Sequence, residues 1–219
     1  MTITPCRYGK SRCGRRWNHR GDLGAWICFL DETGQGLRPP KGRSWSRRGH
    51  RPQVRVRGGE HGARISVAGM VCYRPGKRSR LIYRLHHYRR RKGERAAFTL
   101  TEYKNMLNGA RQQLPGGKIV LVWDNLNIHH STAMRAFIDA HTDWLTVFHL
   151  PAYAPELNPT ESVWSLLKRS MANSLAADLN HLTRMIKHRL KVIQNHPDPI
   201  DGCLTTTDLT ITTTPAITS

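Results

Sequence analysis

Three acidic residues follow sequence features that would fix their positions in a folded chain. Asp31 and Asp124 each follow a run of apolar residues, 26–30 and 119–123, and Glu161 follows a proline-framed turn and begins a helix-like stretch. An acid at the polar end of a buried strand is positioned by the fold, and ligand sites in α/β sheets gather at strand ends. We therefore expect these three side chains to meet in one site.

The chemistry of such a trio is metal binding. Carboxylate oxygens are hard ligands that suit Mg²⁺ or Mn²⁺, which keep several waters and accept the phosphate oxygens of a substrate. Two such ions about 3.5–4 Å apart can activate a nucleophile and stabilise a leaving oxygen in line. The trio therefore predicts a two-ion site that acts on a phosphate backbone.

Other polar residues near these acids have weaker claims to a role. Asn125 and His129 add polar groups after the second aspartate, although an ordinary hydrogen bond explains a histidine at a helix start equally well. Glu32 should point to the opposite face of its strand from its acidic neighbour. Glu156 should serve the turn that contains it, and Trp164 is expected in the core rather than against substrate.

The net charge of +20 lies in the first half of the chain. Residues 1–99 hold 25 Lys and Arg against 5 Asp and Glu, whereas residues 100–219 hold 10 of each kind. Arginine pairs bidentately with phosphate and stacks on bases, so this asymmetry favours a nucleic-acid partner over a merely solvated arginine-rich surface. The candidate DNA-contacting residues are Arg43, Arg47, Arg48, Arg51, Arg89, Arg90, Arg91 and Lys92.

Several other classes of protein are disfavoured. No apolar run approaches the roughly 18 residues of a membrane helix, and the basic N-terminus lacks the apolar stretch of a secretory signal. Five cysteines without a regular framework fit reduced thiols in the cytoplasm, and Cys6 and Cys13 lack the close pairing of a zinc site. Paired carboxylates also serve glycosidases, but the strong positive charge gives that chemistry no support.

The apolar periodicity predicts a β-meander followed by alternating helices and strands. We expect strands at residues 25–31, 53–57, 64–73, 80–86, 118–124 and 144–150. We expect four helices. Thr99 or Thr101 would cap a helix that runs to about Leu114, and Ser131 would cap one at 132–141. Thr160 would cap the third, and Asp178 or Asn180 would begin the last. This order indicates an α/β fold with a mixed sheet and helices on both faces, formed by residues 24–203. The basic arm 1–23 and the Thr-rich tail 204–219 are expected to be poorly ordered.

The residues around the acids resemble the catalytic half of insertion-sequence-630 family transposases, bacterial relatives of the mariner group. The likeness covers about residues 24–203, and 36 residues separate the second and third acids, a spacing of the order that the family uses. The proline-framed block is the most specific part. The matching residues are Leu30-Asp31-Glu32-Thr33-Gly34, Trp123-Asp124-Asn125 with His129, and the block from Pro151 to Glu161 with Trp164 after it.

The resemblance implies a ribonuclease H-like fold with a mixed five-stranded sheet and a catalytic, metal-binding triad of Asp31, Asp124 and Glu161. It implies cleavage of DNA at element ends with Mg²⁺ or Mn²⁺, followed by attack of the freed 3′-hydroxyl on target DNA. Asn125, His129 and Asn158 would be motif residues around the triad. The protein would work at the nucleoid in the bacterial cytoplasm, as a homodimer assembled on DNA.

Two alternatives stay open. Family members carry an N-terminal helix-turn-helix that recognises the element's inverted repeats, whereas the residues before the first catalytic strand show no amphipathic helix pattern. One alternative is therefore a catalytically idle, truncated remnant that binds DNA without sequence preference. The other is a ribonuclease H-like nuclease or resolvase without joining activity, against which the proline-framed block argues.

Overall fold

The computed structural model describes residues 24–40, 47–50, 62–151 and 154–207. At its centre is one five-stranded sheet in the order β3-β2-β1-β4-β5. The N-terminal arm and the strand predicted at 53–57 lie outside the described residues. The strands are β1 (Trp26–Gly36), β2 (Arg64–Arg74), β3 (Lys77–Tyr88), β4 (Ile119–Trp123) and β5 (Leu145–His149).

Strand β1 joins two halves of the sheet that differ in direction. It pairs antiparallel with β2, which pairs antiparallel with β3, and it pairs parallel with β4, which pairs parallel with β5. The β4 strand is buried along its whole length, as the unbroken apolar run 119–123 predicted. The mixed sheet expected from the order of elements is thus present.

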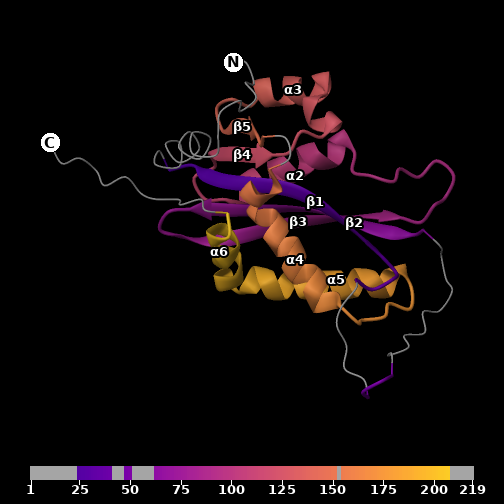
Figure 1. The fold of residues 1–219 in the computed structure, drawn as a ribbon. Coiled ribbons are helices and arrows are strands. Elements are labelled where there is room, and N and C mark those ends of the chain that lie inside the picture. The colour runs from indigo at the N-terminus through magenta and orange to yellow at the C-terminus, as the bar shows by residue number, and fades with distance from the viewer. Residues whose placement is uncertain (1–23, 41–46, 51–61, 152–153, 208–219) are drawn as a thin grey trace.

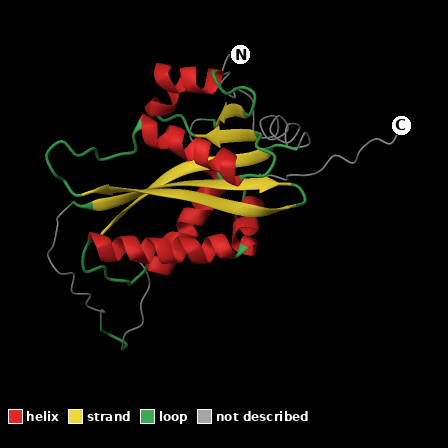
Figure 2. Cartoon of the chain, turned by 180° about the vertical axis from the view of Figure 1, so that it is seen from behind, coloured by secondary structure: helices red, strands yellow, loops and turns green. Residues whose placement is uncertain are grey.

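Helices cover both faces of the sheet, as Figures 1 and 2 show. Alternate side chains of β1 enter two separate cores: Ile27 and Phe29 pack on one side, and Cys28 and Leu30 on the other. One face carries α2 (Leu100–Gln113) and α3 (Thr132–Asp139). The other carries α4 (Pro159–Met171), α5 (Leu179–Asn195) and α6 (Pro197–Thr205), and two short 3₁₀ turns, η1 (Asn127–His130) and η2 (Pro155–Leu157), lie in the connections.

Three local expectations need correction. Asp31 does not close its strand, because β1 continues to Gly36 while paired with β2. Asn158, rather than Thr160, caps α4. Finally, α6 extends through Thr205, so ordered chain continues past residue 204, where a tail was expected.

Helix α6 is held by tertiary contacts that leave little trace in the sequence. Ile200 and Cys203 are buried, and the Tyr73 hydroxyl donates a hydrogen bond to the Ile200 carbonyl at 2.8 Å. Two prolines and a glycine within nine residues give this helix a weak intrinsic propensity. Its stability therefore comes from packing against β3, α4 and α5. None of the helices in the described ranges combines the length and apolarity needed to span a lipid bilayer.

Helix α2 begins with a capping box that also reaches β3. The Thr99 hydroxyl accepts from the Glu102 N–H at 3.3 Å, and the Glu102 carboxylate accepts from the Thr99 N–H at 2.7 Å. The same carboxylate lies 2.9 Å from Nδ1 of His86 on β3. Burial lowers the pKa of His86, but hydrogen bonds to Arg95 and Glu102 outweigh this, so the pKa is raised above its usual value.

Replacing the cap should therefore weaken the fold. We expect Thr99→Ala to lower the free energy of unfolding by about 1 kcal/mol, because it removes the side-chain acceptor and loosens the Glu102 carboxylate. Urea denaturation followed by circular dichroism measures the change. Thr101→Ala, at an exposed position in the same first turn, is the matched control. An equal loss in both variants would contradict the capping role.

Candidate active site

Asp31 is held from the α4 side of the sheet. The Trp164 Nε1–H donates a hydrogen bond to Asp31 Oδ2 at 3.0 Å, and the Trp164 side chain is buried at 1% exposure. The indole lies directly on Gly69 of β2, the residue that pairs with Asp31 across the strands. A Cβ at Gly69 would lie 2.4 Å from Cη2 of the indole, so no other residue fits there without a shift.

Asp124 follows the last residue of β4, where Trp123 pairs with Leu30 of β1. Strand β4 therefore ends level with the residue before Asp31, which brings the two aspartates to the same level of neighbouring strands. His129 Nδ1 lies 3.1 Å from Asp124 Oδ1, and the Leu126 N–H donates to the same oxygen at 3.3 Å. The Asp124 side chain keeps 41% of its exposure, so water and ligands can reach it.

His129 is fixed by its ring contacts. It is 1% exposed and stacks on Trp123, with ring centroids 3.9 Å apart and an interplanar angle of 2°. Tyr103 of α2 meets its edge at 5.2 Å. The imidazole is thus a rigid support for the carboxylate of Asp124, a role that the sequence motif did not specify.

Glu161 stands in the first turn of α4, and three contacts place that turn. Asn158 Oδ1 accepts from the Thr160 N–H at 3.1 Å, and Pro159 occupies the first helical position, where its missing N–H costs nothing. The Thr160 hydroxyl then donates to the carbonyl of Phe29 in β1 at 2.8 Å. The start of α4 is therefore attached to the strand that carries Asp31.

The Asp31 carboxyl lies within electrostatic reach of both Glu161 and Asp124. Burial raises the pKa of Asp31 to about 7, and the charge of Glu161 and, more weakly, that of Asp124 add to the rise. The hydrogen bonds from the Glu32 backbone and the Trp164 indole oppose it. Like charges that are kept this close, with one of them largely buried, favour either a proton or a cation among them.

Glu32 is a fourth acid that interacts electrostatically with this region, although it was expected to point to the opposite face of its strand from Asp31. Burial raises its pKa to about 7, and the charge of Asp124 contributes next, followed by that of Asp31. His86 lowers it, so Glu32 faces the α2 side, as strand alternation predicted. Asp124 therefore lies within electrostatic reach of acids on both faces of β1.

Asn125 and the predicted basic residues have definite places. The Asn125 Nδ2–H donates to the Leu150 carbonyl at 2.8 Å and so joins the ends of β4 and β5. Arg89 and Arg91 turn around Glu94, whose carboxylate accepts both of their backbone N–H groups. Arg47, Arg48, Arg90, Arg91 and Lys92 are exposed, whereas Arg43 and Arg51 lie outside the described residues.

The donor set fits a hard divalent cation in chemical type. Two aspartates and a glutamate offer only oxygen ligands, and both contacts named above for Asp124 use Oδ1, so Oδ2 can turn toward an ion. Within the described ranges, no three His, Cys, Asp or Glu side chains already stand in a metal-binding arrangement. The carboxylates would therefore have to rotate inward around an ion.

Comparison with solved structures identifies the fold. The chain aligns with the mariner Mos1 paired-end complex with Mg at a TM-score of 0.63 and 16% identity, over 96% of this chain and 64% of that one. It aligns with a pre-cleavage Mos1 transpososome at 0.56 and 15%, and with the Mos1 strand transfer complex at 0.54 and 15%, over 94% of this chain in each case. The fold is thus ribonuclease H-like, and the chain spans less than two thirds of each of the first two Mos1 chains.

A family model places the sequence more closely. The model described as DDE superfamily endonuclease matches residues 26–183, a span that contains all three acids. The chain belongs to this family of DDE endonucleases. No curated protein matches its sequence significantly.

The contact at Gly69 should be critical for both stability and the site. We expect Gly69→Ala to lower the free energy of unfolding by about 1–3 kcal/mol, because the new methyl group would push the Trp164 indole, and with it α4, away from the sheet. Urea denaturation measures this loss, and indole fluorescence should report a changed environment for Trp164.

Gly34→Ala is the matched control, since a Cβ at Gly34 on β1 meets nothing within 4 Å. A smaller residue at Trp164 should relieve the clash, so Trp164→Leu should cost less in the Gly69→Ala background than in the wild type. Equal costs of Gly34→Ala and Gly69→Ala would refute the close contact.

Proposed function

We propose that the chain is the catalytic domain of a DNA transposase of the insertion-sequence-630 type. It would cleave phosphodiester bonds at element ends and join the freed 3′-hydroxyl to target DNA, with Mg²⁺ or Mn²⁺ in the site. The observation that carries the proposal is the position of Asp31, which lies within electrostatic reach of both Glu161 and Asp124, acids from two other parts of the fold, beside the end of β4. The similar Mos1 structures, which include a strand transfer complex and paired-end complexes with Mn and with Mg, support it.

The three acids would hold two divalent ions. When bound, such ions lower the pKa of water and neutralise charge on the scissile phosphate. The rest of the chain would position these ligands. Trp164 orients Asp31, His129 orients Asp124, and the Asn158 cap fixes the turn that carries Glu161. Trp164 and His129 each hold one aspartate and the cap fixes the turn of Glu161, so the inward rotation of the carboxylates around the ions would start from fixed backbone positions.

The remaining parts of the proposal concern assembly and location. Two copies would pair on DNA, in keeping with the paired-end complexes among the Mos1 structures. The proposed substrate implies that the protein works beside the chromosome in the bacterial cytoplasm. The exposed cations among Arg47, Arg48 and Arg89 to Lys92 would contact the DNA backbone.

Plasmid nicking tests the catalytic part of this proposal. We expect purified protein with Mn²⁺ or Mg²⁺ to convert supercoiled plasmid to open circles, and EDTA to stop it. Asp124→Asn should reduce the rate roughly hundredfold or more, because a lost metal ligand removes about 3 kcal/mol of transition-state stabilisation. Asp139→Asn, which removes an exposed acid from α3, should leave the rate unchanged.

The outcome also separates the alternatives. Wild-type protein that binds duplex DNA but never nicks it, with either metal, would favour the idle remnant. Nicking without joined products, when oligonucleotides with free 3′-hydroxyl ends are supplied, would favour a nuclease or resolvase. Equal nicking by wild type and Asp124→Asn would defeat the site assignment.

A further inference from the structure

The end of the sheet away from the acids carries four cations on one hairpin. Arg74, Lys77, Arg78 and Arg80, which we call the hairpin cluster, lie at the end of β2 and the start of β3. Arg80 pairs with Cys72, which pairs with Cys28, three residues before Asp31. The backbone of Arg80 is therefore about 10 Å along and about 10 Å across the sheet from that of the nearest acid.

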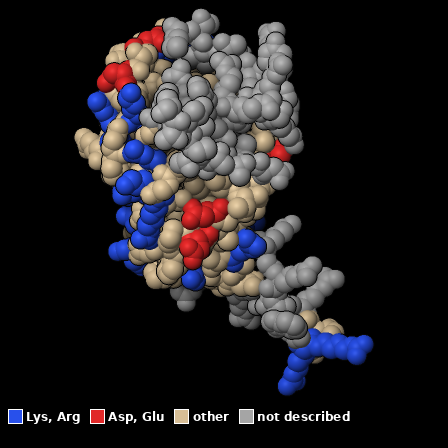
Figure 3. All heavy atoms as spheres, turned by 90° about the vertical axis from the view of Figure 1, so that its left-hand side faces the viewer, with Lys and Arg blue, Asp and Glu red and all other residues tan. Residues whose placement is uncertain are grey.

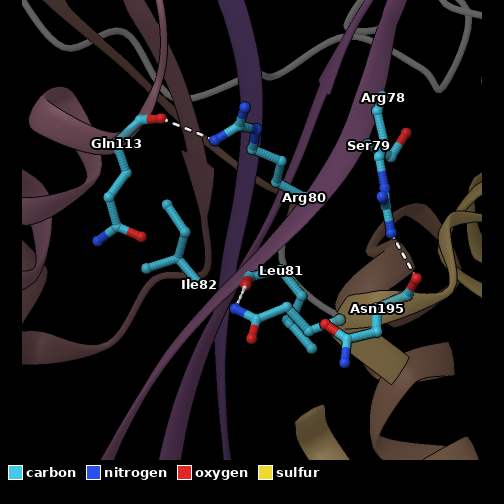
Figure 4. A pocket seen from close by; sticks show the side chains of 8 residues that line it. Arg78, Ser79, Arg80, Leu81, Ile82, Gln113 and Asn195 are labelled. Atoms are coloured by element: carbon cyan, nitrogen blue, oxygen red, sulfur yellow. Dashed lines mark hydrogen bonds between the residues drawn. The ribbon is translucent and has the colours of Figure 1, made fainter. Parts of the chain in front are cut away.

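The arginines of the cluster are held in place by carbonyl oxygens. Arg74 donates to the Pro115 carbonyl at 2.6 Å, Arg80 donates to the Gln113 carbonyl at 2.9 Å, and Arg78 donates to the Asn195 carbonyl. Figure 4 shows Arg80 and Arg78 reaching toward α2 and α5, respectively, from the same edge strand. Each contact uses one nitrogen of a guanidinium, which carries five N–H donors in all.

Two of these guanidiniums also share one aromatic neighbour. Arg74 and Arg80 lie 6.0 and 5.9 Å from the ring centroid of Trp26, which is buried. Two like charges thus lie beside the same indole, and an anion bound against both would reduce their repulsion. No carboxylate of the described residues is within ion-pair distance of the Arg74, Arg78 or Arg80 guanidinium.

The surface between the arginines is hollowed rather than flat. A shallow cavity of about 300 Å³ lies between β3 and the C-terminal ends of α2 and α5, and both Arg78 and Arg80 line it with Gln113 and Asn195. Figure 3 views the molecule from the side that holds the hairpin, and Lys and Arg gather there in a column. The hollow is therefore lined by two guanidiniums together with polar and apolar side chains, and Ser79 in its lining donates to the Asp201 carboxylate.

We propose that the hairpin cluster is a second contact site for duplex DNA, separate from the acids. It would hold the phosphates of a duplex segment that passes this end of the sheet, while another segment occupies the active site. Guanidiniums anchored to carbonyls keep their full charge and fixed directions, which suits them to phosphate oxygens. The site would not read sequence, because its charged donors match the backbone rather than base edges.

Two structural roles compete with this assignment. Arginines on an edge strand can prevent sheets of different molecules from pairing, and cations near helix C-termini stabilise the helix dipole. Neither role requires Arg74 and Arg80 to share one indole, or Arg78 and Arg80 to line one hollow. The charge of the cluster, rather than its hydrogen bonds, should then decide DNA affinity.

Replacing two arginines of the cluster by an uncharged hydrogen-bond donor tests the proposal. The double variant Arg78→Gln, Arg80→Gln keeps an N–H donor at each position but loses two charges. We expect it to bind a fluorescein-labelled duplex of arbitrary sequence about tenfold more weakly near 0.1 M salt, in EDTA so that no cleavage occurs. The slope of log K against log salt should become shallower by about 1.8, or about 0.9 for each lost phosphate contact.

The control removes two charges elsewhere. Arg135→Gln, Arg184→Gln affects exposed cations of α3 and α5 and should change the affinity far less. Arg78→Lys, Arg80→Lys should bind nearly as the wild type does, because the charge stays. Equal losses in the hairpin and control variants would overturn the proposal, as would unchanged DNA affinity combined with new self-association of the hairpin variant.

A second measurement needs no substitution and so does not depend on how the variants fold. Hydrogen exchange of the wild-type chain should slow across residues 76–84 when unlabelled duplex is added in EDTA. Unchanged exchange there, at saturating DNA, would also overturn the proposal. Because both experiments omit metal, they are independent of the plasmid nicking that tests the catalytic function.

Discussion

The contact between the Trp164 indole and the bare backbone of Gly69 determines the geometry on which the rest of the site depends. It allows α4 to approach the sheet closely enough for Nε1 to reach Asp31, while Thr160 attaches the same helix to Phe29 one turn earlier. The position of Glu161 relative to Asp31 is thus set by packing of the helix on the strands, and only secondarily by the two acids themselves. Burial of the carboxyl and, after it, the charge of Glu161 raise the pKa of Asp31, and this cost is offset by the packing of Trp164 and its neighbours in the core.

Much of this arrangement could be predicted from the sequence, because strand-end acids and cap residues are local signals. The expectation that Asp31, Asp124 and Glu161 meet in one site rested on apolar runs and a proline-framed turn. The length of β1 could not be predicted, because its last residues carry no local strand signal and are extended only through their pairing with β2. The role of Gly69 was not evident from the sequence either, because a glycine inside a strand usually indicates a bulge or a less stable strand rather than a position on which a helix side chain packs.

Two further differences arise where local signals compete. Asn158 and Thr160 are both good capping residues, and Pro159 between them decides the matter, because proline suits the first helical position. Helix α6 has poor propensity and depends on tertiary contacts such as the Tyr73 hydroxyl bond to Ile200. The support of Asp124 by His129 required the stack on Trp123, which no linear spacing reveals.

The hydrogen bond between Trp164 and Asp31 joins residues 133 positions apart. A contact of such sequence separation closes a very large loop, and its entropic cost must be met before the contact contributes any stability. The β2–β3 hairpin, in contrast, closes over a few residues and can form early. During refolding, secondary structure should therefore appear well before Trp164 reaches Asp31, and in a nascent chain this contact could form only after α4 has been synthesised and has docked.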